Sequence, residues 1–185
     1  PCFTNEATYW GTATNLVKAR ARFATATVGN YAVFVGGWKT GNTAMGNVDT
    51  YNESLTHTNP TNVTSRYNLA ATSVGDYALF GGGGTDYYTY ATVDVCDKSL
   101  TFSSATDLSS RRMQLAATTA GDRAFFGGGG TAVDVYDTSL VMTTAEDLSA
   151  SRRPAYAATA GDYALFCGGG KLTVDAYDTS LTKTT

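Results

Sequence analysis

The chain has 185 residues and a formal net charge of -3, with charges of both signs scattered along its length. Nonspecific nucleic-acid binding needs a dense basic surface that displaces counterions from phosphate, so this charge excludes nucleic acid as a partner class. No segment approaches the roughly 20 continuous apolar residues of a spanning helix, so we expect no membrane insertion.

Four related segments run through the chain, beginning with FATATVGNYAVF from Phe23 to Phe34. The other three run from Leu69 to Phe80, from Leu115 to Phe126 and from Tyr156 to Phe166. A glycine stands at the same place in each segment, at steps of 46, 46 and 40 residues: Gly29, Gly75, Gly121 and Gly161. Such a period is typical of blade-type and solenoid arrays, in which one unit cannot bury its apolar face alone. We therefore expect a single repeat domain over residues 1–185, with repeats at approximately 5–51, 52–96, 97–136 and 137–177.

One repeat predicts four short strands separated by turns. In the third copy the expected strands are 115–119, 123–126, 133–137 and a weaker one at 140–145. Gly121-Asp122 favours a tight hairpin, and the run Gly127 to Gly130 lets another backbone approach the strand end closely. Turn signals break every apolar run before a helix could form, so the fold class is all-β.

These residues resemble the kelch family of β-propellers. The resemblance lies in four apolar or aromatic residues before a double glycine (Tyr77 to Gly82), in the strand Val133 to Asp137, and in an arginine before each first strand. It implies a β-propeller of four-stranded antiparallel kelch-like blades, with four repeats present. The near-identical sequences of the units resemble those of the amplified kelch-like arrays of bacterial and bacteriophage surface proteins.

The two ends of the chain leave the number of blades open. The alignment indicates that the chain starts partway through a third strand and stops partway into a fourth. A closed ring could form by joining these ends within one blade. Alternatively, the chain is a slice of a longer array, or one part of a ring completed by a second copy, because open strand edges readily pair with another chain. A homo-oligomer through the open repeat ends is therefore one candidate partner state.

The candidate binding residues are loop aromatics and arginines at one end of the strands. The aromatic residues lie in inserts that follow the glycine runs, and an arginine precedes the first strand of each blade. The candidates are Trp38, Tyr87, Tyr88, Tyr90, Arg20, Arg66, Arg112 and Arg152. Aromatic faces beside guanidinium groups suit sugars, carboxylates or peptides. A repeated arginine can equally be a structural strut, paired with an aspartate such as Asp94, Asp134 or Asp175, and a loop tyrosine need not contact a ligand.

The same sequence argues against catalysis, cofactors and metals. His57 is the single histidine, which excludes histidine-rich metal sites and leaves a Ser-His-Asp triad without a visible partner motif. The glycine runs are not phosphate loops, because no Lys-Ser/Thr and no helix follow them. Cys96 and Cys167 replace other residues within the repeats, so we interpret them as small buried side chains rather than ligands or a redox pair.

We therefore expect a noncatalytic binding or structural scaffold that acts through protein–protein interaction. The alternative is a lectin-like module that holds glycan with its loop aromatics; an enzyme on a propeller scaffold is a third, weaker reading. Low charge and a Thr-, Ser-, Gly- and Tyr-rich composition favour an extracellular or virion-surface location.

Overall fold

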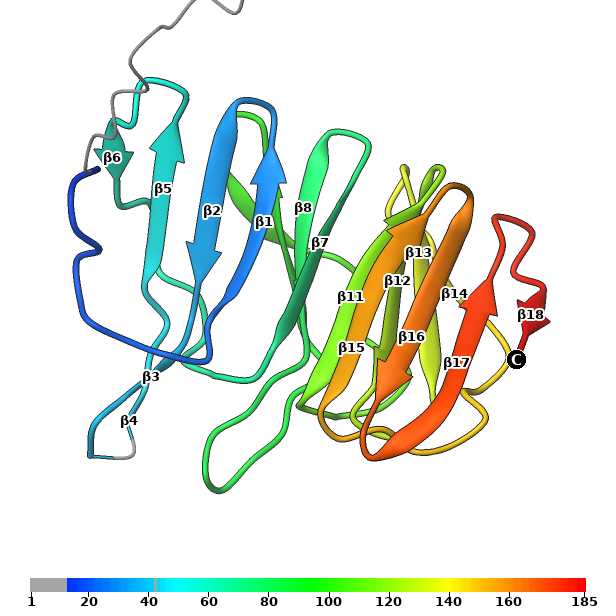
Figure 1. Cartoon of the computed structure of the whole chain (residues 1–185). Helices are drawn as coiled ribbons and strands as arrows, with labels where there is room; N and C mark the ends of the chain where they lie inside the picture. The colour runs from blue at the N-terminus through cyan, green and yellow to red at the C-terminus, as the bar shows by residue number, and fades with distance from the viewer. Residues whose placement is uncertain (1–12, 42) are drawn as a thin grey trace, which may run out of the picture.

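The computed structural model describes residues 13–41 and 43–185, and every regular element in these ranges is a β-strand (Figure 1). Sheet 1 contains β1 (Ala24–Val28), β2 (Tyr31–Val35), β5 (Val48–Asn52) and β6 (His57–Thr58). Sheet 2 contains β7 (Ala70–Val74), β8 (Tyr77–Gly81), β9 (Val93–Asp97) and β10 (Phe102–Ser104). Sheet 3 contains β11 (Leu115–Ala120), β12 (Arg123–Gly128), β13 (Val133–Asp137) and β14 (Met142–Thr144). Sheet 4 contains β15 (Ala155–Ala160), β16 (Tyr163–Gly168), β17 (Lys171–Tyr177) and β18 (Lys183–Thr184). A two-stranded ribbon, β3 (Trp38–Lys39) and β4 (Thr43–Ala44), branches from sheet 1.

Each four-stranded sheet is an antiparallel meander whose strands pair in chain order. The first hairpin turns at the repeated glycine, and in sheet 3 the pair Ala120 and Arg123 closes around Gly121-Asp122. Gly121 has a φ of 53°, whereas Asp122 does not have a positive φ, which is the pattern of a type II′ turn. Glycine reaches this conformation without steric cost, so the predicted hairpin is confirmed.

The turn between the third and fourth strands is held by a side chain. In sheet 3 the carboxylate of Asp137 accepts hydrogen bonds from the backbone N–H groups of Ser139 (2.9 Å) and Val141 (3.0 Å). These bonds fix Leu140 in the left-handed region, with a φ of 62°. Because the same Asx turn recurs in each sheet, the fourth strand starts at the same place every time.

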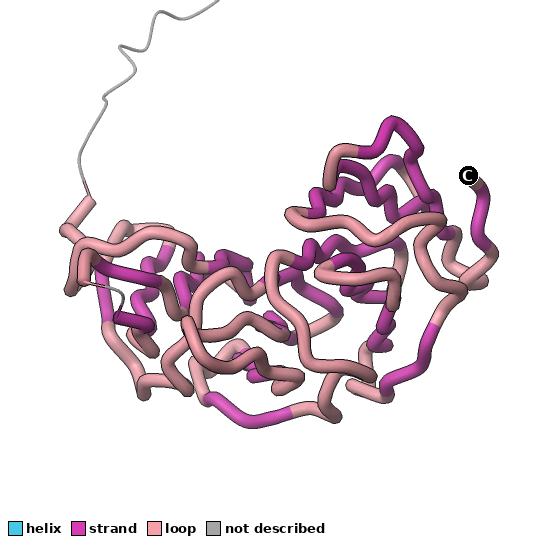
Figure 2. The backbone as a smooth tube through the Cα atoms, turned by 90° about the horizontal axis from the view of Figure 1, so that it is seen from below, coloured by secondary structure: helices cyan, strands magenta, loops and turns pink. Residues whose placement is uncertain are grey.

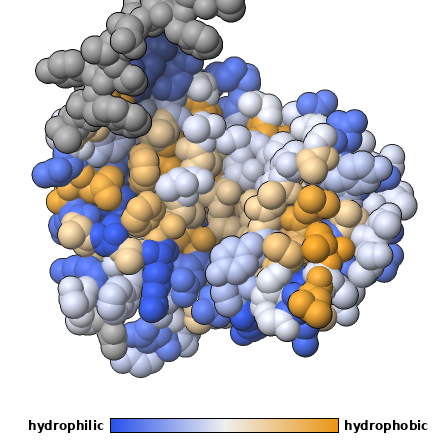
Figure 3. All heavy atoms as spheres, in the orientation of Figure 1, coloured by the Kyte–Doolittle hydropathy of each residue, from blue (hydrophilic) through white to orange (hydrophobic). Residues whose placement is uncertain are grey.

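The four sheets stand side by side along an open arc, with sheet 1 at one end and sheet 4 at the other (Figure 2). Their first strands are neighbours in the order β1, β7, β11, β15 and line the concave side. The apolar cores lie between successive sheets, one core at each of the three junctions. Hydrophobic side chains also remain at the surface of the last sheet, over β16 and β17 (Figure 3). Neighbouring sheets therefore bury the faces that they turn toward each other, as the repeat period predicts.

The structure confirms the all-β class and the four-stranded antiparallel units, and β13 matches the predicted third strand. The predicted fourth strand at 140–145 was too long, because the Asx turn occupies residues up to Val141 and β14 covers only Met142–Thr144. Closure into a propeller stays a prediction. The N-terminal strand expected around residues 4–7 lies outside the described residues. Among those residues no helix could span a membrane.

Candidate binding surface

An arginine precedes the first strand of each sheet, and its side chain is buried in an ion pair with an aspartate. The pairs are Arg20 with Asp49, Arg66 with Asp94, Arg112 with Asp134, and Arg152 with Asp175. We call each sheet, together with the segment that leads into it, a unit, numbered as the sheets are. In unit 3 the Nη2 of Arg112 also donates to the carbonyl oxygen of Phe126 at 3.1 Å. Buried guanidinium groups of this kind are not presented to a ligand at the surface. The structural alternative thus describes all four arginines, and we leave them out of the candidate binding surface.

Hydrogen bonds lower the pKa of two of these aspartates, Asp49 and Asp175. Burial alone would raise the pKa of Asp49, but hydrogen bonds from the backbone of Val17 and the side chains of Arg20 and His57 outweigh it, and the pKa lies below its usual value. The pKa of Asp175 is lowered in the same way: burial opposes the shift, while hydrogen bonds from Arg152 and Ser149 drive it. Both carboxylates are therefore structural anions at neutral pH.

In three of the four sheets, a tyrosine on the third strand donates a hydrogen bond to a backbone carbonyl oxygen in the segment before the sheet. Tyr136 donates to the carbonyl oxygen of Thr106 at 2.7 Å, and Tyr177 donates to that of Glu146 at 2.8 Å. Tyr51 makes the equivalent bond to Thr14 at 2.6 Å. In sheet 2 the position is held by Cys96, which is buried, and burial raises the pKa of its thiol to about 12. This confirms the interpretation of Cys96 as a small core residue; Cys167 is only half-buried.

Titration to alkaline pH is expected to destabilise the fold through Tyr136 and Tyr177. Burial first, and then the nearby carboxylates of Asp134 and Asp175, raise the pKa of these hydroxyls well above the ordinary 10.0. The unfolded chain releases these protons near pH 10, so the stability they contribute is complete below that pH and is lost as the pH rises through the raised values. Urea unfolding between pH 8 and about 11 measures this loss, given the ordinary tyrosine pKa of about 10. The double variant Y136F/Y177F should show a shallower pH dependence, and an equal slope would contradict the assignment.

Trp38 lies in a stack with a cation that the sequence analysis did not single out. The guanidinium carbon of Arg22 is 5.1 Å from the ring centroid of Trp38 and 5.7 Å from that of Tyr67. The hydroxyl of Tyr67 donates to Asp86, and this hydrogen bond is the main cause that raises the pKa of Tyr67. Arg22 and Tyr67 therefore connect the β3–β4 ribbon of unit 1 to the insert of unit 2. Cation–π contacts at such partly exposed sites contribute about 0.5–1 kcal/mol each.

The insert between β8 and β9 presents two tyrosines to solvent. The backbone N–H groups of Tyr87 and Tyr88 both bond the hydroxyl oxygen of Thr85, and the Tyr88 carbonyl accepts from the Thr85 N–H at 2.7 Å. This closed turn leaves Tyr87 87% exposed and Tyr88 69% exposed. Tyr90 is half-buried, and its N–H donates to the Gly83 carbonyl at 2.9 Å. Tyr87 and Tyr88 are thus available to a partner, whereas Tyr90 anchors the insert.

We call the surface formed by Arg22, Trp38, Tyr87 and Tyr88, which the buried Tyr67 supports from below, the aromatic end. The β3–β4 ribbon and the β8–β9 insert project from the same end of the sheets, at the bottom of Figure 1. The prediction that the two inserts share one end is confirmed, and only units 1 and 2 contribute to it.

A hollow of 360 Å³ lies beside the aromatic end. Three of its lining residues, Arg22, Asn68 and Gln114, occupy equivalent places before the first strand of successive units. All three have a positive φ, and they are linked by backbone bonds of 2.9 Å from Asn68 N to Arg22 O and from Gln114 N to Asn68 O. The sequence analysis missed these residues. The signal was a polar residue two positions after the arginine in the first three repeats; Pro154 takes this place in the fourth.

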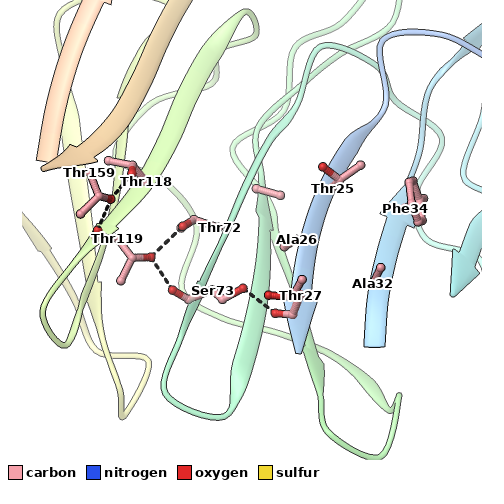
Figure 4. Close-up of a pocket in the computed structure, with 11 residues that line it drawn as sticks. Thr25, Ala26, Thr27, Ala32, Phe34, Thr72, Ser73, Thr118, Thr119 and Thr159 are labelled. Atoms are coloured by element: carbon pink, nitrogen blue, oxygen red, sulfur yellow. Dashed lines mark hydrogen bonds between the residues drawn. The ribbon is translucent and has the colours of Figure 1, made fainter. Parts of the chain in front are cut away.

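A second hollow, of 560 Å³, occupies the concave side of the arc (Figure 4). Hydroxyl-bearing and small residues of β1, β7, β11 and β15 line it, together with Phe34 of β2. Hydroxyl groups on these strands bond across the junctions between sheets, so they mainly link neighbouring sheets. They belong to Thr72, Ser73, Thr118, Thr119 and Thr159.

His57 takes part in structure at the edge of sheet 1. Its Nε2 lies 2.6 Å from Asp49 Oδ1, and its ring stacks on Tyr51 with centroids 4.9 Å apart. Among the described residues no serine, threonine or cysteine hydroxyl or thiol bonds to His57, and no group of three or more His, Cys, Asp or Glu side chains is placed to hold a metal ion.

No protein-family model matches the chain, and the curated proteins give no sequence match. The kelch resemblance therefore rests on the residues of the repeat alone.

Proposed function

We propose that this chain is a noncatalytic binding module, built as a propeller-type array of kelch-like blades, that holds a protein partner at the aromatic end. The observation that carries the proposal is the Trp38–Arg22–Tyr67 stack, continuous through Asp86 with the exposed Tyr87 and Tyr88. Trp, Tyr and Arg are the residues most enriched at binding hot spots. The scaffold does not need them, because units 3 and 4 form without such inserts. The composition of the chain supports an extracellular or virion-surface location for this module.

Selection of peptides from a random display library against the immobilised chain tests this role. Peptides that bind the wild type should lose at least about tenfold in affinity to W38A and to Y88A, since hot-spot truncations cost 2 kcal/mol or more. The matched control is V141A, which shortens another exposed side chain at the β13–β14 turn. Circular dichroism checks that each variant remains folded. Peptides that bind all four proteins equally would place the interaction elsewhere and reject the proposal.

Glycan is the second candidate ligand, favoured by the hollow beside Arg22, Asn68 and Gln114. Guanidinium and amide groups can bond sugar hydroxyls while Trp38 and Tyr88 offer stacking faces. A glycan array probed with the wild type, W38A, Y88A and Q114A separates the two candidates. Binding that falls with Q114A as well as W38A would support glycan, and an array without bound glycans would reject it.

A further inference from the structure

The last sheet exposes a face that the first three sheets bury. At one repeat position Val48, Val93 and Val133 are fully buried, whereas Val174 is 46% exposed. The same holds at two further positions. Leu165 is half-buried where Val33, Leu79 and Phe125 are buried, and Ala160 is exposed where Val28, Val74 and Ala120 are buried. The hydrophobic residues over β16 and β17 in Figure 3 mark this face. We call the surface formed by Ala160, Leu165, Cys167 and Val174 the terminal face.

Within the arc, the next sheet covers this face with an aromatic ring. An added Cβ at Gly81 would lie 2.9 Å from Cε1 of Phe126, and one at Gly127 would lie 2.8 Å from Cε1 of Phe166. The rings of β12 and β16 therefore rest on glycines of the preceding sheet. In sheet 4 this position is Cys167. Sheet 1 carries the larger Val35 there, fully buried against sheet 2, so a side chain of this size is compatible with the junction.

A series of hydroxyl bonds crosses the same junctions on the concave side (Figure 4). Ser73 donates to the carbonyl oxygen of Thr27, Thr119 donates to that of Ser73, and Thr159 donates to that of Thr119. Each unit thus gives one hydroxyl to the unit before it and one carbonyl oxygen to the unit after it. At the ends of the described series, Thr159 retains a carbonyl oxygen and Thr27 retains a hydroxyl without a neighbouring unit.

A backbone bond repeats in the same manner at the other end of the strands. The N–H groups of Gly37, Gly83 and Gly129 donate to the carbonyl oxygens of Arg66, Arg112 and Arg152, each at 2.9 Å. Gly168 and Gly169 have φ values of 90° and 64°, which match the 90° and 67° of Gly128 and Gly129. Sheet 4 therefore holds the Gly169 N–H in the donating conformation, and no arginine carbonyl of the described residues bonds to it.

Sheet 1 carries the complementary surface. Ala32, Phe34 and Tyr51 are half-buried, whereas their counterparts in sheets 2 to 4 are fully buried against a preceding sheet. The Thr27 hydroxyl and the Arg20 carbonyl stand at the places that the Thr159 carbonyl and the Gly169 N–H would meet. Apolar surface, one hydroxyl donor and one carbonyl acceptor thus fit the terminal face position by position.

We propose that the terminal face docks sheet 1 of a second copy of this chain and forms a fourth junction like the three inside the arc. Phe34 of the incoming copy lies over Leu165, Cys167 and Val174, Thr27 donates to the Thr159 carbonyl, and Gly169 donates to the Arg20 carbonyl. The contact is head-to-tail, so it closes into a ring of copies or extends as a filament. In a ring, the concave hydroxyl groove would become an enclosed axial channel.

Native mass spectrometry over a concentration series tests this docking. We expect the wild type to appear at twice 19.4 kDa or a higher multiple as concentration rises. V174R places a charge in the proposed junction and should raise the dissociation constant at least tenfold, because an unpaired buried charge is strongly unfavourable. V141R is the matched control: it adds the same charge at a valine that is 56% exposed, away from the terminal face, and should assemble like the wild type.

Alkylation of Cys167, followed by peptide mass spectrometry, gives a readout independent of mass. Its rate should fall in the wild type as the concentration rises into the assembled range, and it should stay constant in V174R. A wild type that remains at 19.4 kDa throughout would overturn the proposal. So would assembly that V174R and V141R weaken equally, or assembly that leaves Cys167 as reactive as in the single chain, because the contact would then use another surface.

Discussion

Replacing Arg112 by alanine is expected to lower the free energy of unfolding by about 3–5 kcal/mol, since it leaves the buried Asp134 charge unpaired. Asp134 is fully buried and accepts from Arg112 Nη2 and from the Ser109 N–H at 3.2 Å. Removal of the arginine also takes away the donor to the Phe126 carbonyl. Urea unfolding at pH 7, followed by circular dichroism, measures the change.

The control for this prediction is an ion pair of the same chemistry in water. Lys98 and Asp76 pair at the surface, where both side chains are largely exposed. K98A is expected to change the free energy of unfolding by less than about 1 kcal/mol. The double variant R112M/D134L should recover most of the loss of R112A, since it leaves no buried charge behind. A loss in R112A no larger than that in K98A would contradict the structural role of the arginine.

Replacing Phe126 by alanine is expected to cost about 3–5 kcal/mol of unfolding free energy, the usual range for a fully buried phenylalanine. Its ring fills the core between sheets 2 and 3 and meets Tyr136 edge-on, with centroids 5.8 Å apart and an interplanar angle of 84°. The same urea experiment measures the loss. F102A is the control, because Phe102 is only half-buried in the short β10 and should cost less.

A double-mutant cycle shows whether the ring acts through Gly81. G81A alone should destabilise the fold, because the added methyl group would lie 2.9 Å from Cε1 of Phe126. In an F126L background the smaller side chain leaves room for the methyl group. The two substitutions should therefore couple by about 0.5–3 kcal/mol, as residues in direct contact do. Strictly additive losses would mean that the glycine is required for another reason.

The repeat unit, its strands and its turns could be predicted from the sequence, because they depend on local chemistry. The glycine of each hairpin, the alternation in Val133 to Asp137 and the Asx residue before each fourth strand act within a few residues. Trp38, Tyr87 and Tyr88 were also found from the sequence, because an insert that interrupts the repeat can be recognised when the repeats are aligned. The weak fourth strand was placed too broadly because three residues of pairing leave little pattern to read.

The role of each candidate residue depends on how the sheets pack, which the sequence pattern does not show. The strut arginines and the loop aromatics both looked suited to binding, and burial separates them: Arg66 and Arg152 are enclosed with their aspartates, while Tyr87 and Tyr88 face solvent. Arg22 became part of the surface because packing of two units places it between Trp38 and Tyr67. The exposed terminal face is likewise a property of the arrangement. Apart from Cys167, its residues follow the same repeat pattern as their buried counterparts, and the presence or absence of a neighbouring sheet decides whether they lie in a core or at a surface.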